Sequence, residues 1–197
     1  MGCHARGSRY EANDAAALQW VWATLIDSTV QAYGLVLPAL TAEEREQYYA
    51  ESRISAGFLG LAPEDLPANW HAFQQYMETM LHSDVLGVGL AARHIAQQVL
   101  TGAGSWLRIP AWYRALTAQL LPPRFREEFQ LACGERQRRS VDRALRWLHR
   151  IYVVLPDKLR YVAPYLEAQE KLAGRGYPSL AVRLMNRLWV GQPSLLT

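Results

Sequence analysis

The 197-residue chain has few cysteines. Cys3 and Cys133 lie far apart, with neither a CxxC pair nor a His/Cys cluster around them, which argues against a disulfide framework and a structural zinc site. The chain also lacks an uncharged apolar run of about 18 residues, and its first ten residues lack the apolar core of a signal peptide. We therefore expect a cytoplasmic protein without a transmembrane segment.

Several functional motifs are missing as well. There is no GxGxxG after a strand, no Walker loop, no GxSxG elbow and no DxDxDG loop, so nucleotide, hydrolase and calcium chemistry lack their usual sequence signals. Strict apolar–polar alternation is almost absent, whereas apolar residues recur every three or four positions. This periodicity predicts an all-α, single-domain multi-helix bundle that spans residues 1–197.

Caps and breakers predict where the helices begin and end. Asn13-Asp14 precedes a nearly uncharged first helix, expected at about 15–33, in which Asp27 is the single charge and Gly34 is the stop. Thr41 and Glu44 form a capping-box pattern for a helix to about Ala56. Further helices are expected at about 70–81, 89–100, 110–121, 135–154, 157–172 and 178–189. The residues expected to be buried are Trp22, Leu25, Trp147 and Ile151.

Basic residues gather toward the C-terminus. Residues 134–197 carry 12 basic and 5 acidic side chains, against 9 and 13 in residues 1–133. Nucleic acid, lipid phosphates or an acidic cofactor would suit this charge, and so would a solvated helix face. Helix 135–154 is two-faced, but its arginine face lacks the Asn, Gln, Ser or Thr side chains that read base edges, so no specific nucleic-acid partner is expected. The arginines are Arg136, Arg139, Arg143, Arg146 and Arg150.

Histidines are the most obvious candidates for acid–base or metal chemistry. His71, His82, His94 and His149 form no HxxxH, HExxH or Cys/His spacing. We expect them to be surface histidines or histidines with satisfied hydrogen bonds in the core.

A family resemblance adds what periodicity does not supply. It is carried by HARGSRYEANDAAALQWVWATLIDSTVQAY, LTAEEREQYYAESRISAGFLGL, LPANWHAFQQYMETML, LLPPRFREEFQL and LPDKLRYVAPYLEA. Together these segments resemble the catalytic domain shared by MpaB-type oxygenases and the latex-clearing rubber oxygenases. The resemblance implies a globin-like or bundle fold around haem b, and a haem-dependent oxidoreductase that uses dioxygen on a small apolar, alkene-bearing substrate.

The resemblance also implies site residues. A family segment of the form His-Ala-x-Val-x-Gly corresponds to His4-Ala5-Arg6-Gly7, so His4 is the expected proximal ligand of the haem iron. Many members have a histidine where this chain has Trp22, which cannot ligate iron. Trp22, Thr24 and Leu25 are expected to line the cofactor pocket.

The family domain ordinarily starts several dozen residues earlier, with helices that complete the distal side. The chain is therefore expected to be an N-terminally shortened member. The alternative function is a cofactor-free helical remnant or interaction protein without catalysis.

Overall fold

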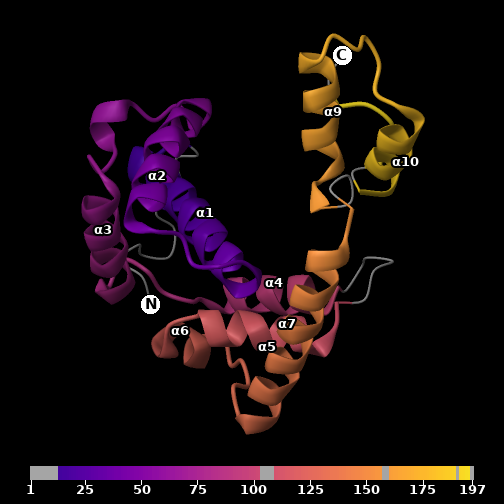
Figure 1. The fold of residues 1–197 in the computed structure, drawn as a ribbon. Coiled ribbons are helices and arrows are strands. Elements are labelled where there is room, and N and C mark those ends of the chain that lie inside the picture. The colour runs from indigo at the N-terminus through magenta and orange to yellow at the C-terminus, as the bar shows by residue number, and fades with distance from the viewer. Residues whose placement is uncertain (1–12, 103–108, 157–159, 190, 196–197) are drawn as a thin grey trace. The chain divides into compact units, whose positions relative to one another are not determined.

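The computed structural model describes residues 13–102, 109–156, 160–189 and 191–195. Within these ranges it contains nine α-helices, two short 3-10 helices and no strand, which confirms the all-α, multi-helix prediction (Figure 1). Contacts group the chain into two compact units, residues 1–147 and residues 148–197. The single-domain organisation stays a prediction, and each unit is described by itself.

The first unit contains most of the helices. They are α1 (Ala15–Val36), α2 (Ala42–Ala56), α3 (Trp70–His82), α4 (Leu90–Thr101), α5 (Ala111–Leu120), α6 (Pro123–Glu128) and most of α7 (Glu135–Val154). The 3-10 helices η1 (Gly57–Leu59) and η2 (Pro63–Asp65) connect α2 to α3.

Helix α1 starts where its cap predicts and ends later than expected. The Asp14 side chain accepts a hydrogen bond from the backbone N–H of Ala17 at 2.9 Å. Gly34 was the expected stop, but the helix continues to Val36. A single glycine weakens a helix without terminating it. Leu37 takes an extended conformation before Pro38, as the residue before a proline is disposed to do.

Helix α2 begins with the predicted capping box. The Glu44 carboxylate accepts from the Thr41 backbone N–H at 2.8 Å, and the Thr41 hydroxyl accepts from the Glu44 backbone N–H at 3.1 Å. Two backbone donors at the helix start are thereby satisfied. Thr41 and Glu44 confirm the start of α2 that the sequence predicts.

An aromatic cluster joins the first three helices. Its members are Trp22 from α1, Tyr49 from α2, and Trp70 and Phe73 from α3; ring centroids lie 5.9 Å apart for Trp22–Tyr49 and 5.1 Å apart for Tyr49–Phe73. Trp22 Nε1 donates to Ser55 Oγ at 3.1 Å and the Tyr49 hydroxyl donates to the Pro67 carbonyl at 2.7 Å. The buried Trp70 indole N–H has no hydrogen-bond partner among the described residues. This cluster fixes the rotation of α1 about its own axis.

Of the four burial predictions, one is confirmed, one holds in part and two are wrong. Trp22 is buried, as expected, whereas Ile151 is only half-buried. Leu25 is 59% exposed, because α1 turns Trp22, Ala23 and Ile26 into the core and leaves Leu25 on another face. Trp147 is 62% exposed, because Val141 is the fully buried residue of α7 and Trp147 is rotated away from it around the helix.

The second unit pairs α9 (Ala163–Leu172) with α10 (Leu180–Trp189). A buried Glu167 carboxylate joins them: it accepts from the Asn186 side-chain amide of α10 and from the Ser194 hydroxyl and Leu195 backbone N–H that follow. Such charge-assisted hydrogen bonds hold the end of the described chain against both helices.

Candidate functional site

A cavity of about 750 Å³ lies in the first unit between α1, α3, α5 and α6. Positions 20, 24, 27, 31 and 35 of α1 line it, which is the spacing of one helix face. The aromatic cluster holds the neighbouring face of α1 in the core. The same helix therefore supplies both core and cavity wall. We call this space the apolar cavity; its apolar wall away from α1 includes Met77, Leu81, Leu86, Val88, Leu116, Leu120, Leu121, Pro122, Phe125 and Phe129.

The loop of residues 83–88, part of the cavity wall, is tied to α6. The Arg124 guanidinium donates to the carbonyls of Ser83 at 2.8 Å and Leu86 at 2.7 Å. The Glu128 carboxylate accepts from the Val88 backbone N–H at 2.9 Å, and this hydrogen bond, with the neighbouring Arg124, lowers the pKa of Glu128. The positively charged Arg124 thus holds two carbonyls of the loop, and the negatively charged Glu128 holds the backbone N–H of the loop's last residue.

Arg126 ties α6 to α5, another wall of the cavity. Its Nε donates to the Ala118 carbonyl at 2.7 Å, and its Nη2 donates to the Leu121 carbonyl at 2.9 Å. These carbonyls belong to the last turn of α5 and the residue after it, where a helix leaves acceptors unpaired. A cation there also suits the negative end of the helix dipole. Short helix α6 consequently positions two walls of the apolar cavity.

The polar atoms of the cavity lie mainly along α1. Asp27 is half-buried, and burial raises the pKa of its carboxyl above the ordinary value, although the hydrogen bond from the Gln31 amide acts in the opposite direction. Thr24 and Thr117 donate their hydroxyl protons to the helix carbonyls of Val21 and Tyr113. Their oxygens remain able to accept a hydrogen bond from a ligand. The cavity therefore suits a largely apolar molecule with at most one polar end near Asp27.

The four site residues that the sequence predicted fall in different places. His4 lies outside the described residues. Thr24 lines the apolar cavity, Trp22 lies in the aromatic cluster on another face of α1, and Leu25 is exposed on a third. The roles of these residues toward a cofactor stay predictions.

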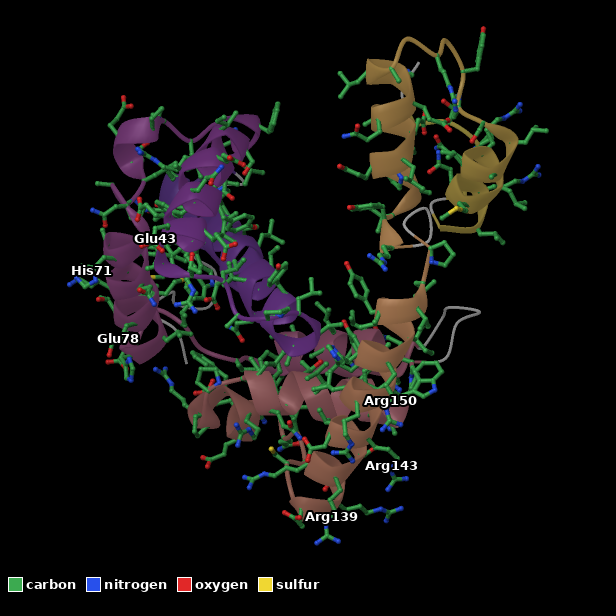
Figure 2. All side chains as sticks on the ribbon, in the orientation of Figure 1. Glu43, His71, Glu78, Arg139, Arg143 and Arg150 are labelled. Atoms are coloured by element: carbon green, nitrogen blue, oxygen red, sulfur yellow. The ribbon has the colours of Figure 1, made fainter. Side chains whose placement is uncertain are left out.

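The described histidines lie at the surface. His71, His82, His94 and His149 are all exposed, and Figure 2 shows His71 on the side of α3 turned away from α1. His71 and His94 contact the glutamine amide one turn later, and His82 contacts the Glu78 carbonyl. In the part of the chain that the structure describes, no group of three or more His, Cys, Asp or Glu side chains is arranged to hold a metal ion.

A second, more polar cavity of about 820 Å³ borders α4, α5 and the start of α7. His94, Arg114 and Arg136 line it together with several glutamines, and Phe129 borders this cavity as well as the apolar one. The charged lining residues of the second cavity are basic, whereas the charged lining residue of the apolar cavity is Asp27. The two cavities therefore favour ligands of different chemistry.

The arginines of α7 are exposed, so the basic side of this helix faces away from the core. Figure 2 shows the labelled Arg139, Arg143 and Arg150 extending from α7 into solvent. Arg139 is paired with Glu135 one turn earlier at 2.8 Å, and both side chains are largely exposed. Among the described helices, none is long and apolar enough to cross a membrane.

Sequence reasoning singled out Asp27 as the lone charge of its helix but assigned it no role, and it missed Gln31, Thr117 and Phe129. The signal for Asp27 was one acidic residue in a 22-residue helix that is otherwise uncharged. For residues on α5 and α6 the sequence holds no comparable signal, because their proximity to α1 depends on the packing of distant segments.

One comparison with known proteins gives a match, and its bounds nearly coincide with those of the first unit. No curated protein and no solved structure gives a match. Residues 2–150 match the family described as ER-bound oxygenase mpaB/B'/Rubber oxygenase, catalytic domain. The match covers most of the chain, including every residue that lines the apolar cavity. The chain thus belongs to the family of the mpaB and rubber oxygenase catalytic domain.

Proposed function

We propose that this protein is a haem-dependent oxygenase that oxidises a small apolar, alkene-bearing substrate with dioxygen. Membership in a family of oxygenase catalytic domains supports the reaction class. The observation that carries the substrate class is the apolar cavity, which is lined mostly by aliphatic and aromatic side chains and bears its polar groups mainly on α1.

Cavity size and chemistry both favour such a substrate. A volume of about 750 Å³ lies within the usual range for small-molecule sites. A carbon–carbon double bond offers no strong hydrogen-bonding group, so the wall formed by Leu116, Phe125 and Phe129 suits it, since binding there leaves no polar group unpaired. Asp27 and Gln31 would orient a polar end of the molecule.

Haem b is proposed as the cofactor on the family resemblance. Its iron needs an axial protein ligand, and the resemblance implies an imidazole. The residues lining the apolar cavity include no histidine or cysteine, and His94 borders the second cavity instead. The described residues alone therefore do not fit a haem, and we derive no catalytic step through it. We propose His4 as the iron ligand.

Haemin titration of the whole chain tests the cofactor. We expect a Soret band that saturates with one haem per chain and that His4→Ala removes. His71→Ala is the matched control, because His71 is exposed on α3 and should leave binding unchanged. Binding that survives His4→Ala would overturn the ligand assignment.

Filling the cavity tests the substrate site. Leu116→Trp adds bulk to its wall, whereas Leu90→Trp adds the same bulk at an exposed position of α4. In haemin-loaded protein supplied with a series of apolar alkenes, we expect Leu116→Trp to slow oxygen consumption by about 100-fold through misplacement of the substrate. Leu90→Trp should not slow it. Equal rates for the two variants would place the substrate elsewhere.

The alternative is a cofactor-free helical protein. The observation that favours it is Trp22, which packs into the aromatic cluster and hydrogen-bonds Ser55 where many family members carry a histidine. Absence of saturable haemin binding in the titration would favour this alternative.

A further inference from the structure

Helix α10 of the second unit has a well-defined buried side. Val182 and Asn186, four residues apart, are buried, and Asn186 donates a hydrogen bond to the buried Glu167 of α9. The backbone N–H of Ser179, just before α10, donates to Glu170 of α9 at 2.7 Å. These contacts hold α10 against α9 in one rotational setting.

Because that setting is fixed, three leucines are exposed. Leu180, Leu184 and Leu188 recur every four residues and are 80%, 63% and 69% exposed. We call these three residues the leucine face. Leu172, the last residue of α9, and Tyr177, in the segment before α10, are exposed to a similar degree. A contiguous exposed apolar face of this kind marks an interaction site more often than scattered apolar residues do.

Arginines lie along one edge of the leucine face. Arg183 and Arg187 are exposed, and their three- and four-residue spacing from the leucines places them beside that face. Helix α10 contains no acidic residue. The acidic residues nearby on α9 are already engaged, since Glu167 is buried and Glu170 is paired with Arg175 at 3.1 Å. The solvent side of α10 is therefore both apolar and positively charged.

We propose that the leucine face and its two arginines dock this protein on an anionic lipid surface. A short helix with leucines on one side and arginines beside them is typical of helices that lie in the membrane interface. Apolar side chains would enter the headgroup boundary, and each arginine near an anionic surface would strengthen binding about fivefold. The family match ends at residue 150 and leaves this unit without an assigned role.

The positive charge beside the leucine face and the small area of that face argue against a second copy of the chain as the partner that covers it. Two leucine faces in symmetric contact would bring four arginines together with no acidic residue of α10 between them. A stable dimer also buries about 20–30 residues on each side, far more than the three leucines and two arginines of this surface. An anionic membrane offers negatively charged headgroups to the two arginines and an apolar boundary to the three leucines.

Vesicle sedimentation of the whole chain tests the proposal. We expect binding to vesicles of phosphatidylcholine mixed with phosphatidylserine, weaker binding to phosphatidylcholine alone, and a loss of affinity as salt is raised. The double variant Leu184→Asn, Leu188→Asn should lose binding to both kinds of vesicle. Arg183→Gln, Arg187→Gln should lower affinity for the mixed vesicles by about 25-fold and leave the weak binding to phosphatidylcholine unchanged.

Matched controls use equally exposed positions elsewhere. Leu90→Asn on α4 and Arg139→Gln, Arg143→Gln on α7 should leave vesicle binding unchanged. No binding of the unmodified chain, or binding that only the α7 variant abolishes, would overturn the proposal. So would a dimer in analytical ultracentrifugation that the leucine variant dissociates. All variants change exposed residues, and circular dichroism would verify that each is folded.

Discussion

Arg124 and Glu128 form an ion pair one helical turn apart on α6, with Nε and Oε1 separated by 3.2 Å, and both also hold the loop of residues 83–88. Arg124 satisfies two loop carbonyls and Glu128 satisfies one loop N–H. Because Leu86 and Val88 line the apolar cavity, this pair determines the shape of the cavity wall.

Replacing Arg124 should loosen that wall. Arg124→Met removes both hydrogen bonds to the loop carbonyls while keeping an apolar stem, so we expect a loss of about 1–3 kcal/mol in unfolding free energy. Hydrogen exchange at the Val88 amide should accelerate. Arg143→Met, at an exposed position of α7, is the control and should change stability by no more than about 0.5 kcal/mol. Equal effects of the two substitutions would contradict the role of Arg124.

Lowering the pH should weaken the attachment of the loop of residues 83–88 to α6. The pKa of Glu128 is lowered in the folded protein by the Val88 N–H and by Arg124, so its stabilising contribution is present above the ordinary glutamate value of 4.5. That contribution is lost as pH falls from there through the lowered pKa. We expect the protection of the Val88 amide, the slowing of its exchange relative to the intrinsic rate at the same pH, to fall over this range, and Glu128→Gln to show low protection already at neutral pH. Protection in the unmodified chain that stays constant down to acid unfolding would contradict this account.

Neighbouring positions of α1 should respond very differently to a charge. Ile26 is buried, whereas Leu25 is 59% exposed. Ile26→Asp places an unpaired carboxylate in the core and should cost about 3 kcal/mol or more. Leu25→Asp should cost about 0.5 kcal/mol. Urea unfolding of the two variants compares them directly, and similar costs would mean that α1 is rotated from its present setting.

Tyr49 should make the fold sensitive to alkali. Burial raises the pKa of its hydroxyl from 10.0 to about 12, so the folded chain retains a proton that the unfolded chain releases. The contribution of Tyr49 is complete below pH 10 and is lost as pH rises toward 12. At neutral pH, Tyr49→Phe should cost about 1 kcal/mol through the lost hydrogen bond to Pro67. Tyr33→Phe, at an exposed position, should cost less, as urea titrations at several pH values would reveal.

Asp27 should carry a stability cost at neutral pH. Burial raises the pKa of its carboxyl, so the favourable protonated form is fully present below the ordinary value of 3.8 and is lost as pH rises through the raised pKa. Asp27→Asn removes the charge, and we expect a higher melting temperature at pH 7 and a smaller gain in acid. If Asp27 orients the substrate, the same variant should raise KM. A lower melting temperature at pH 7 would contradict the burial argument.

Local sequence signals accounted for most helix positions. Asp14, Thr41 and Glu44 act on backbone groups within three residues, so their capping could be read without knowledge of distant contacts. The arginine side of α7 could also be predicted locally, because the helical periodicity places these arginines on the side opposite Val141. Pro123 begins α6, where its missing N–H costs nothing at the first helical position.

The rotation of each helix and its packing against its neighbours could not be predicted from such local sequence signals. Leu25 and Ile26 are both large and aliphatic, and their opposite exposure follows from how the aromatic cluster rotates α1. The apolar cavity likewise depends on long-range contacts, such as those from Arg124 to a loop about 40 residues earlier. Helix type and extent follow from nearby residues, whereas burial and the candidate site arise from packing among distant segments, which one-dimensional periodicity does not encode.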